Sequence, residues 1–185
     1  MNSFYSEEEL AQLGLKSYGK NVRISRKTSI YGVGNISLGS NVRIDDFCIL
    51  SGNITVGDYV HVAAYAALFA GDAGIVVGDF CGISSRTTIY AVTDDYSGEL
   101  LTNPTIPNEF KHIISGRVTL CKHALIGASC VVLPGVTLGE GCSFGSMSLI
   151  NKSADAWTIN FGIPSKPIKP RSKKLLLLEE ELYNG

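Results

Sequence analysis

The side chains of this sequence that could take part in acid–base chemistry are two adjacent aspartates and three histidines. Asp94 and Asp95 stand together, and the histidines are His61, His112 and His123. An aspartate of ordinary pKa is a poor base near neutral pH, but its oxygens can orient an amine or a hydroxyl group. We therefore expect Asp94, with Asp95 nearby, to position a reacting group. Each histidine is interpreted either as a surface residue or as a binding residue, with His61 and His123 facing a groove and His112 reaching the site of a neighbouring subunit.

The cysteines suggest packing rather than chemistry. The sequence holds five of them and no CxxC pair, so neither a structural metal site nor a disulfide framework is expected. Cys121 follows an aliphatic residue and is interpreted as a turn residue rather than a nucleophile. The others take the place of small inward-facing residues, where a thiol acts as a compact hydrophobe: Cys48, Cys81, Cys130 and Cys142.

Length and composition limit the class of protein. The 185 residues suit one domain, and 45% hydrophobic with 18% charged residues supplies enough apolar side chains for a core. The 16 basic residues are balanced by 17 acidic residues, so we expect no nucleic-acid-binding surface. The longest apolar stretch, Val62 to Ala70, is too short for a membrane helix. Met1 to Glu9 show no secretory signal, so a cytoplasmic location is expected.

A six-residue repeat must position these side chains. The residue after each repeat aliphatic is often Gly or Asp, which suits a turn, and a small or β-branched residue comes four positions after the aliphatic. Neither a helix nor one long strand places this spacing on a single face, whereas short strands joined by corners do. Each hexapeptide therefore predicts one strand and one turn around a prism-shaped core. The aliphatics are Leu38, Ile44, Leu50, Val56, Val62, Leu68, Val77, Ile83, Ile89, Leu120, Ile126, Val132, Leu138, Phe144 and Ile150, with a weaker copy at Tyr18, Ile24 and Ile30.

This pattern resembles the hexapeptide-repeat family, whose fold is a left-handed parallel β-helix with three hexapeptides per coil. The resemblance implies an all-β protein of about six coils. Its handedness comes from the resemblance alone, since it opposes the usual right-handed crossover. Residues 1–185 are thus predicted to form a single domain, with an N-terminal helical cap over 1–17, the β-helix over 18–150, and a turn and helix over 151–185.

Two interruptions and two flanking helices complete the prediction. Leu68 to Val77 spans nine residues instead of six, and residues 93–116 form a long inserted loop without the repeat. A loop of this length is usually functional, and its aromatic residues and prolines favour an ordered arm. The capping-box spacing from Ser6 to Glu9 predicts a helix over residues 7–13. Residues 171–183 are the other predicted helix, and the four leucines from Leu175 to Leu178 imply packing against the body or another subunit.

Two motifs resemble those of the coenzyme A-dependent sugar acyltransferases. They are Ile126-Gly127-Ala128-Ser129 with Leu133-Pro134-Gly135-Val136, and Phe161-Gly162-Ile163-Pro164-Ser165-Lys166-Pro167-Ile168. The resemblance implies a homotrimer in which the pantetheine arm of acetyl-CoA lies between two β-helices and meets backbone amides and carbonyls of the turns. The cofactor contacts it implies are Gly127 and Ser146 along the arm, Gly162 and Pro164 at the purine, and Lys166 near a phosphate. Gly127 as a corner glycine only, and Lys166 as a solvated charge, remain open.

The whole sequence is similar to acyltransferases that modify nucleotide-linked 4-amino-4,6-dideoxyhexoses for surface polysaccharides. The likeness includes Asn2 to Leu10, Asn41 to Gly52, Thr93 to Gly98 and Pro104 to Pro107. It implies that Asp95, Tyr96 and the three histidines bind the nucleotide sugar and that Asp94 and Ser84 are catalytic. O-acetyltransferases of the galactoside and maltose branch carry a histidine where this sequence has Asp94. Because a hydroxyl needs a base and an amine does not, we predict N-acylation over O-acylation.

Two further classes are weighed against this prediction. Zinc carbonic anhydrases share the fold, but the three histidines here lack that family's close i, i+5 pair, so no metal is expected. A non-catalytic assembly subunit would not need the long loop or the turn from Gly162 to Pro167. The acyl chain, the sugar stereochemistry and the nucleotide base stay open, since pocket shape decides them.

Overall fold

The repeat aliphatics are buried, as their spacing predicts. From Leu38 to Ile150 each repeat aliphatic is at most 4% exposed. The small or β-branched residues four positions after the aliphatics pack in the same core. The weaker copy fits less well, because Ile24 is buried while Tyr18 is 42% exposed. The computed structural model describes residues 3–184, so Met1, Asn2 and Gly185, with the expectations that fall on them, lie outside the described residues.

One face of the stack is a sheet of parallel two-residue strands, closed at the end by a hairpin. Its strands, in spatial order, are β2 (Arg23–Ile24), β5 (Arg43–Ile44), β7 (His61–Val62), β9 (Gly82–Ile83), β14 (Leu125–Ile126), β17 (Ser143–Phe144) and β19 (Thr158–Gly162), with β20 (Ser165–Pro170) antiparallel to β19. Each parallel step adds one coil, so the stack has about seven coils rather than six. The prediction fell short because it ended at Ile150, whereas β19 continues the face.

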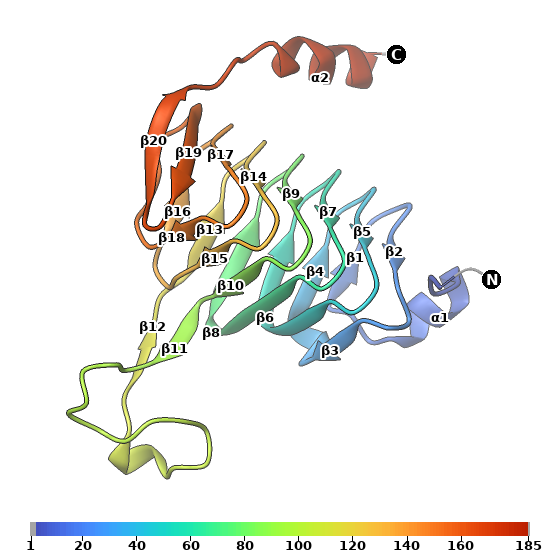
Figure 1. Cartoon of the computed structure of the whole chain (residues 1–185). Coiled ribbons are helices and arrows are strands. Elements are labelled where there is room, and N and C mark those ends of the chain that lie inside the picture. The colour runs from blue at the N-terminus through green and yellow to red at the C-terminus, as the bar shows by residue number, and fades with distance from the viewer. Residues whose placement is uncertain (1–2, 185) are drawn as a thin grey trace.

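A second sheet supplies the other two faces of the prism (Figure 1). The strands β6 and β8 each run through the corner between these faces, which joins them into one sheet. The other members are β1 (Ser17–Tyr18), β3 (Ser29–Tyr31), β4 (Ile36–Leu38), β10 (Thr88–Tyr90), β13 (Val118–Leu120), β15 (Val131–Val132), β16 (Thr137–Leu138) and β18 (Leu149–Ile150), beside β6 (Ile49–Val56) and β8 (Ala67–Val77). The architecture is the parallel β-helix that the repeat predicts.

Both interruptions of the repeat lie at the same corner of the prism. In the first, the extra residues of β8 are absorbed as register shifts against β6, so the strand continues through them. In the second, the chain leaves the stack after β10 and returns before β13. It forms an arm built on the antiparallel strands β11 (Val92–Asp94) and β12 (Ile113–Ser115), with a 3₁₀ turn over Asn108–Phe110. The arm projects from the stack, as Figure 1 shows.

The two predicted helices are present. Helix α1 (Glu7–Gln12) begins at the expected capping box, in which the Glu9 N–H donates to the Ser6 hydroxyl at 3.3 Å. Helix α2 (Leu175–Asn184) begins four residues later than predicted. Its start is delayed because the Arg171 guanidinium donates to the carbonyls of His123 and Gly141 at 2.9 and 3.0 Å, which fixes the chain on the stack. A further 3₁₀ turn covers Val33–Asn35.

The cysteines occupy the predicted inward positions. Four of the five are buried in the core, and Cys121 is half-buried. Burial raises the pKa of Cys48 to about 11 and that of both Cys81 and Cys142 to about 12, so these thiols stay protonated at neutral pH. Neither helix within residues 3–184 has the length and apolar character needed to cross a membrane.

Candidate active site

The candidate residues Ser84, Gly127 and Ser146 lie along one edge of the prism. This edge, the Ser84 corner, consists of the turns at residues 45–48, 63–66, 84–87, 127–130 and 145–148. Successive turns are joined by backbone hydrogen bonds, such as Ser84 N–H to Ile126 O and Gly127 N–H to Phe144 O, both at 2.9 Å. Because neighbouring coils are about 4.8 Å apart, the three candidates form a continuous line over three coils.

Small side chains predominate at the Ser84 corner. The first two positions of four successive turns are Ala63-Ala64, Ser84-Ser85, Gly127-Ala128 and Gly145-Ser146. The third position is larger and exposed in three of these turns: Tyr65, Arg86 and Met147. Ser84 is half-buried, and no described residue makes a hydrogen bond with its hydroxyl, so that hydroxyl is available to a ligand.

Gly127 is required by the approach of two coils. A Cβ at this position would lie 2.6 Å from the Ser146 nitrogen and 2.8 Å from the Phe144 oxygen, and both are backbone atoms that cannot move aside. The glycine therefore has a structural reason that is independent of cofactor binding, which leaves its cofactor contact a proposal.

We expect Gly127→Ala to lower the Tm by roughly 2–12 °C, because forcing a methyl group into packed backbone costs about 1–3 kcal/mol. Gly34→Ala is the matched control, since its Cβ would meet nothing closer than 4.0 Å. Thermal unfolding followed by circular dichroism measures both variants. Equal Tm values for the two would show that the Ser84 corner relaxes around a side chain.

The hairpin of β19 and β20 stands at the C-terminal end of the Ser84 corner. The Gly162 N–H donates to the Ser148 hydroxyl at 3.2 Å, which ties the hairpin to the last turn of that corner. Pro164 lies at the tip, next to Ile163, which is 72% exposed. Lys166 is exposed, and no carboxylate among the described residues pairs with it. The candidate cofactor residues of both motifs thus follow one another along the same edge.

The arm holds the remaining acidic candidates. Asp94 is half-buried at the end of β11, and its carboxylate accepts from the Asn103 N–H at 3.2 Å. Hydrogen bonds from the Ser97 N–H and hydroxyl lower the pKa of Asp95. Tyr96 is 86% exposed and His112 is also exposed. Because the arm leaves the prism at another corner than the one with Ser84, a single chain has Asp94 and Ser84 on different edges.

His61 lies on the face next to the Ser84 corner, in register with Gly82. Its Nε2 is 2.8 Å from Asp45 Oδ2, and the Arg43 Nε donates to the other oxygen of the same carboxylate at 2.7 Å. Burial alone would raise the pKa of Asp45, but these two hydrogen bonds outweigh it and leave the pKa lowered. The sequence analysis missed that Asp45 binds both Arg43 and His61. The repeat offered a signal, because Arg43 and His61 occupy equivalent positions in neighbouring coils.

His123 lies elsewhere than expected. It belongs to the corner at residues 121–124, is 6% exposed, and its Nε2 is 2.7 Å from Glu179 of α2. Its ring also stacks on Phe80 at 5.1 Å between centroids. The sequence left His123 as either a surface residue or a residue that faces a groove, and the structure shows helix α2 over it with Glu179 as its partner. The structure thus gives His123 a contact that anchors the C-terminal helix.

Comparison with known proteins identifies the family of this chain. A family profile described as bacterial transferase hexapeptide (six repeats) matches residues 117–152. The dTDP-4-amino-4,6-dideoxy-D-glucose acyltransferase of Escherichia coli is 46% identical over 180 residues, which cover 96% of this chain and 93% of that protein. The chain belongs to the hexapeptide-repeat acyltransferases.

Solved members of the hexapeptide-repeat acyltransferases match over the full length. AntD, an N-acyltransferase from Bacillus cereus, has a TM-score of 0.98 and 53% identity over 100% of this chain and 98% of its own, in an S84C mutant complex with dTDP-4-amino-4,6-dideoxyglucose and coenzyme A. Another AntD complex contains dTDP and 3-hydroxybutyryl-CoA.

A more distant relative by sequence is the putative lipopolysaccharide biosynthesis O-acetyl transferase WbbJ of Escherichia coli K12. It is 28% identical over 79% of this chain and 74% of its own.

Proposed function

We propose that this hexapeptide-repeat acyltransferase moves an acyl group from a coenzyme A thioester to the 4-amino group of dTDP-4-amino-4,6-dideoxyglucose. The observation that carries the proposal is the full-length match to AntD, which was solved with that sugar and coenzyme A. The Escherichia coli relative is named for the same acceptor. We propose acetyl-CoA as the acyl donor. The alternative donor is 3-hydroxybutyryl-CoA, which the second AntD complex favours. We assign the reaction to the cytoplasm and to surface-polysaccharide synthesis.

The Ser84 corner is the proposed binding groove for coenzyme A. Its small side chains leave room for the pantetheine arm to reach backbone groups at Gly127 and Ser146. We propose that Gly162 and Pro164, in the hairpin at the end of this corner, contact the purine. Lys166, which is exposed and has no carboxylate partner among residues 3–184, would bind a phosphate. The carbonyl carbon of the thioester would then lie near Ser84, at the end of the Ser84 corner away from the hairpin.

In the proposed reaction, the lone pair of the sugar amine attacks the thioester carbonyl carbon and forms a C–N bond. The tetrahedral adduct collapses as the C–S bond breaks, the amine loses one proton, and the departing thiolate accepts it. Asp94 orients the amine by accepting a hydrogen bond from it. The Ser84 hydroxyl donates to the oxygen that becomes negative in the adduct, which stabilises the transition state.

We infer that the active form is a homotrimer in which two chains share each site. The support is the position of the arm: strand β11, which ends at Asp94, leaves the stack at another corner than the one with Ser84. Figure 1 shows β11 and β12 projecting from the stack. The arm also exposes apolar side chains, including Leu101 at 57% and Phe110 at 55%, which suits burial against a second copy. Closed cyclic symmetry then gives three equal sites.

Asp94→Asn should lower kcat by about 10-fold or less if Asp94 only orients the amine, because the amide keeps the size and most of the hydrogen bonds. A general base is worth about 10²–10⁴-fold, so the two roles separate clearly. The rate should still rise with pH in the variant, since that ionisation belongs to the substrate amine. Steady-state kinetics across pH test this, and loss of several orders of magnitude together with the alkaline rise would make Asp94 the base.

O-acylation is the second candidate function, favoured by the name of the relative WbbJ. A thiol-release assay separates the candidates when acetyl-CoA is tested against three acceptor classes. We expect turnover with dTDP-4-amino-4,6-dideoxyglucose, and little with the free amino sugar or with galactosides. Turnover with galactosides alone would favour O-acylation. Absence of coenzyme A binding by calorimetry would instead indicate a non-catalytic assembly subunit.

A further inference from the structure

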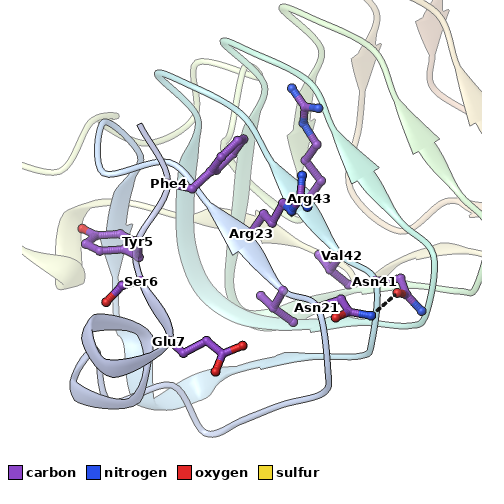
Figure 2. A pocket seen from close by; sticks show the side chains of 10 residues that line it. Phe4, Tyr5, Ser6, Glu7, Asn21, Arg23, Asn41, Val42 and Arg43 are labelled. Carbon is purple, nitrogen blue, oxygen red and sulfur yellow. Dashed lines mark hydrogen bonds between the residues drawn. The ribbon is translucent and has the colours of Figure 1, made fainter. Parts of the chain in front are cut away.

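A cavity of about 370 Å³, the α2 cavity, lies between helix α2 and strands β9 and β14 of the stack. Its apolar lining includes Phe80, Leu125, Leu175, Leu178 and Leu182. Leu125, Leu178 and Leu182 are exposed to solvent. The cavity beside the N-terminal segment differs from it, because arginine and asparagine side chains line that one (Figure 2). The α2 cavity therefore suits an apolar occupant.

Helix α2 is fixed to the stack by residues other than its exposed leucines. Glu179 lies 2.7 Å from the Nε2 atom of His123, and the Tyr183 ring meets two aromatic rings of the stack edge-on. Leu178 and Leu182 are four positions apart, so they share the face of the helix that lines the α2 cavity. One wall of the cavity is thus held in place while its leucines remain open to contact.

The α2 cavity adjoins the Ser84 corner. Gly82 lines the cavity and precedes Ser84 by two residues, so their Cα atoms are at most about 7 Å apart. A Cβ atom on Gly82 would lie 2.9 Å from the Leu125 Cδ1 atom, so this glycine leaves the space that the leucine side chain occupies. A group that fills the cavity would therefore lie beside the proposed site of acyl transfer.

The arm carries an apolar pair at a matching distance from Asp94. Leu101 and Phe110 are both exposed, and the Leu101 N–H donates to the Phe110 carbonyl oxygen at 2.9 Å. The Asn103 N–H donates to the Asp94 carboxylate at 3.2 Å, and Leu101 is at most about 7 Å from Asn103. If Asp94 of one copy lies at Ser84 of another, the apolar pair can therefore reach the α2 cavity.

Charge favours the same contact. The arm, residues 93–116, is acidic, and the segment that leads into α2 is basic. No cation of that segment forms an ion pair within residues 3–184. Opposite charges on two surfaces favour their association and fix their orientation. The arm contains Asp94, Asp95, Glu99 and Glu109 against Lys111, whereas the segment before α2 contains Arg171, Lys173 and Lys174.

We propose that the α2 cavity binds the arm of a second copy of this chain, with Leu101 and Phe110 packed against Leu178 and Leu182. The inference rests on the proposed function, because the shared site is what brings the arm to the Ser84 corner. Leu178 and Leu182 are then positioning residues. They hold the arm, and the arm holds Asp94 beside the substrate amine.

Cysteine cross-linking tests the contact. The variant with Leu101→Cys and Leu178→Cys has one thiol on the arm and one in the α2 cavity, and copper–phenanthroline oxidises such a pair to a disulfide. We expect two and three covalently linked chains on a non-reducing gel. Four of the five native cysteines are buried, which keeps the background low. Neither single variant should form these bands in comparable yield.

The matched control combines Leu101→Cys with Leu177→Cys. Leu177 is 62% exposed and Leu178 is 65% exposed, but Leu177 does not line the α2 cavity. The control should therefore cross-link much less. Equal cross-linking at the two positions, or none at Leu178, would overturn the docking surface.

Kinetics test the positioning role. Leu178→Glu places a carboxylate where the acidic arm should dock, and we expect kcat to fall about 10- to 100-fold because Asp94 is displaced. The Tm should not change, since the side chain is exposed. Leu177→Glu should keep kcat within about twofold of the wild type. An unchanged kcat in Leu178→Glu would overturn the positioning role.

The cross-link and the acyl transfer separate this inference from the proposed function. If Leu101→Cys links to Leu178→Cys between chains while the wild-type protein acylates no dTDP-linked amino sugar, the docking surface stands and the proposed function fails. If the wild-type protein acylates that sugar while no cross-link forms, the proposed function stands and the docking surface fails.

Discussion

Ser84→Ala is expected to lower kcat by about 10²–10³-fold, with little change in the KM for acyl-CoA. A donor aimed at the developing oxyanion acts only in the transition state, and its removal typically costs this much. The substitution removes one hydroxyl that makes no hydrogen bond with a described residue, while the Ser84 N–H to Ile126 O bond of the backbone remains. The fold should therefore be unaffected.

Ser85→Ala is the matched control, because this neighbouring serine lies on the same turn and carries the same group. Its kcat should stay within about threefold of the wild type, since no part in the reaction is proposed for it. Steady-state kinetics of both variants provide the measurement. If Ser84→Ala changed KM and left kcat unaltered, Ser84 would bind substrate uniformly and would not stabilise the transition state.

Mixing two strongly impaired variants should restore activity if the site is shared between chains. Asp94→Ala removes the carboxylate from the arm, and we expect a loss of about 10²-fold because the amine is no longer oriented. Ser84→Ala removes the donor from the corner. When the two variants are unfolded together at equal amounts and refolded, about a quarter of the sites in random trimers receive both wild-type residues.

The expected activity of the mixed sample is therefore about a quarter of the wild-type value, well above that of either variant refolded alone. Wild-type protein taken through the same refolding gives the reference. If the mixture were no more active than the average of its two components, Asp94 and Ser84 would act within one chain, and the arm would have to fold back onto its own β-helix.

The core and the corner could be predicted because the repeat fixes them. Spacing alone places Ile44, Leu68 and Ile126 inside, and the same register brings Ser84, Gly127 and Ser146 onto one edge. The capping box likewise marked the start of α1. In each case a local pattern determines the position, so no distant contact has to be known.

Contacts between distant segments could not be predicted in this way. The burial of His123 depends on Glu179, 56 residues away, and the late start of α2 depends on Arg171 finding carbonyls of the stack. A cavity is likewise lined by residues far apart in the sequence, since Phe4 and Tyr5 of the N-terminal segment share it with Arg23 and Arg43 of the first coils. The additional coil was missed because β19 lacks the hexapeptide spacing, although its pairing with β17 continues the face.

A matched pair of acceptors tests N-acylation of a nucleotide sugar most directly. The pair is dTDP-4-amino-4,6-dideoxyglucose and the dTDP-sugar that carries a hydroxyl group at C4 and is otherwise identical. Each is incubated with acetyl-CoA, and the product is analysed by mass spectrometry before and after treatment with hydroxylamine, which cleaves esters and spares amides. We predict one acetyl group on the amino sugar that survives the treatment, and negligible transfer to the hydroxyl analogue. Comparable transfer to both acceptors, with a product that hydroxylamine cleaves, would contradict the account.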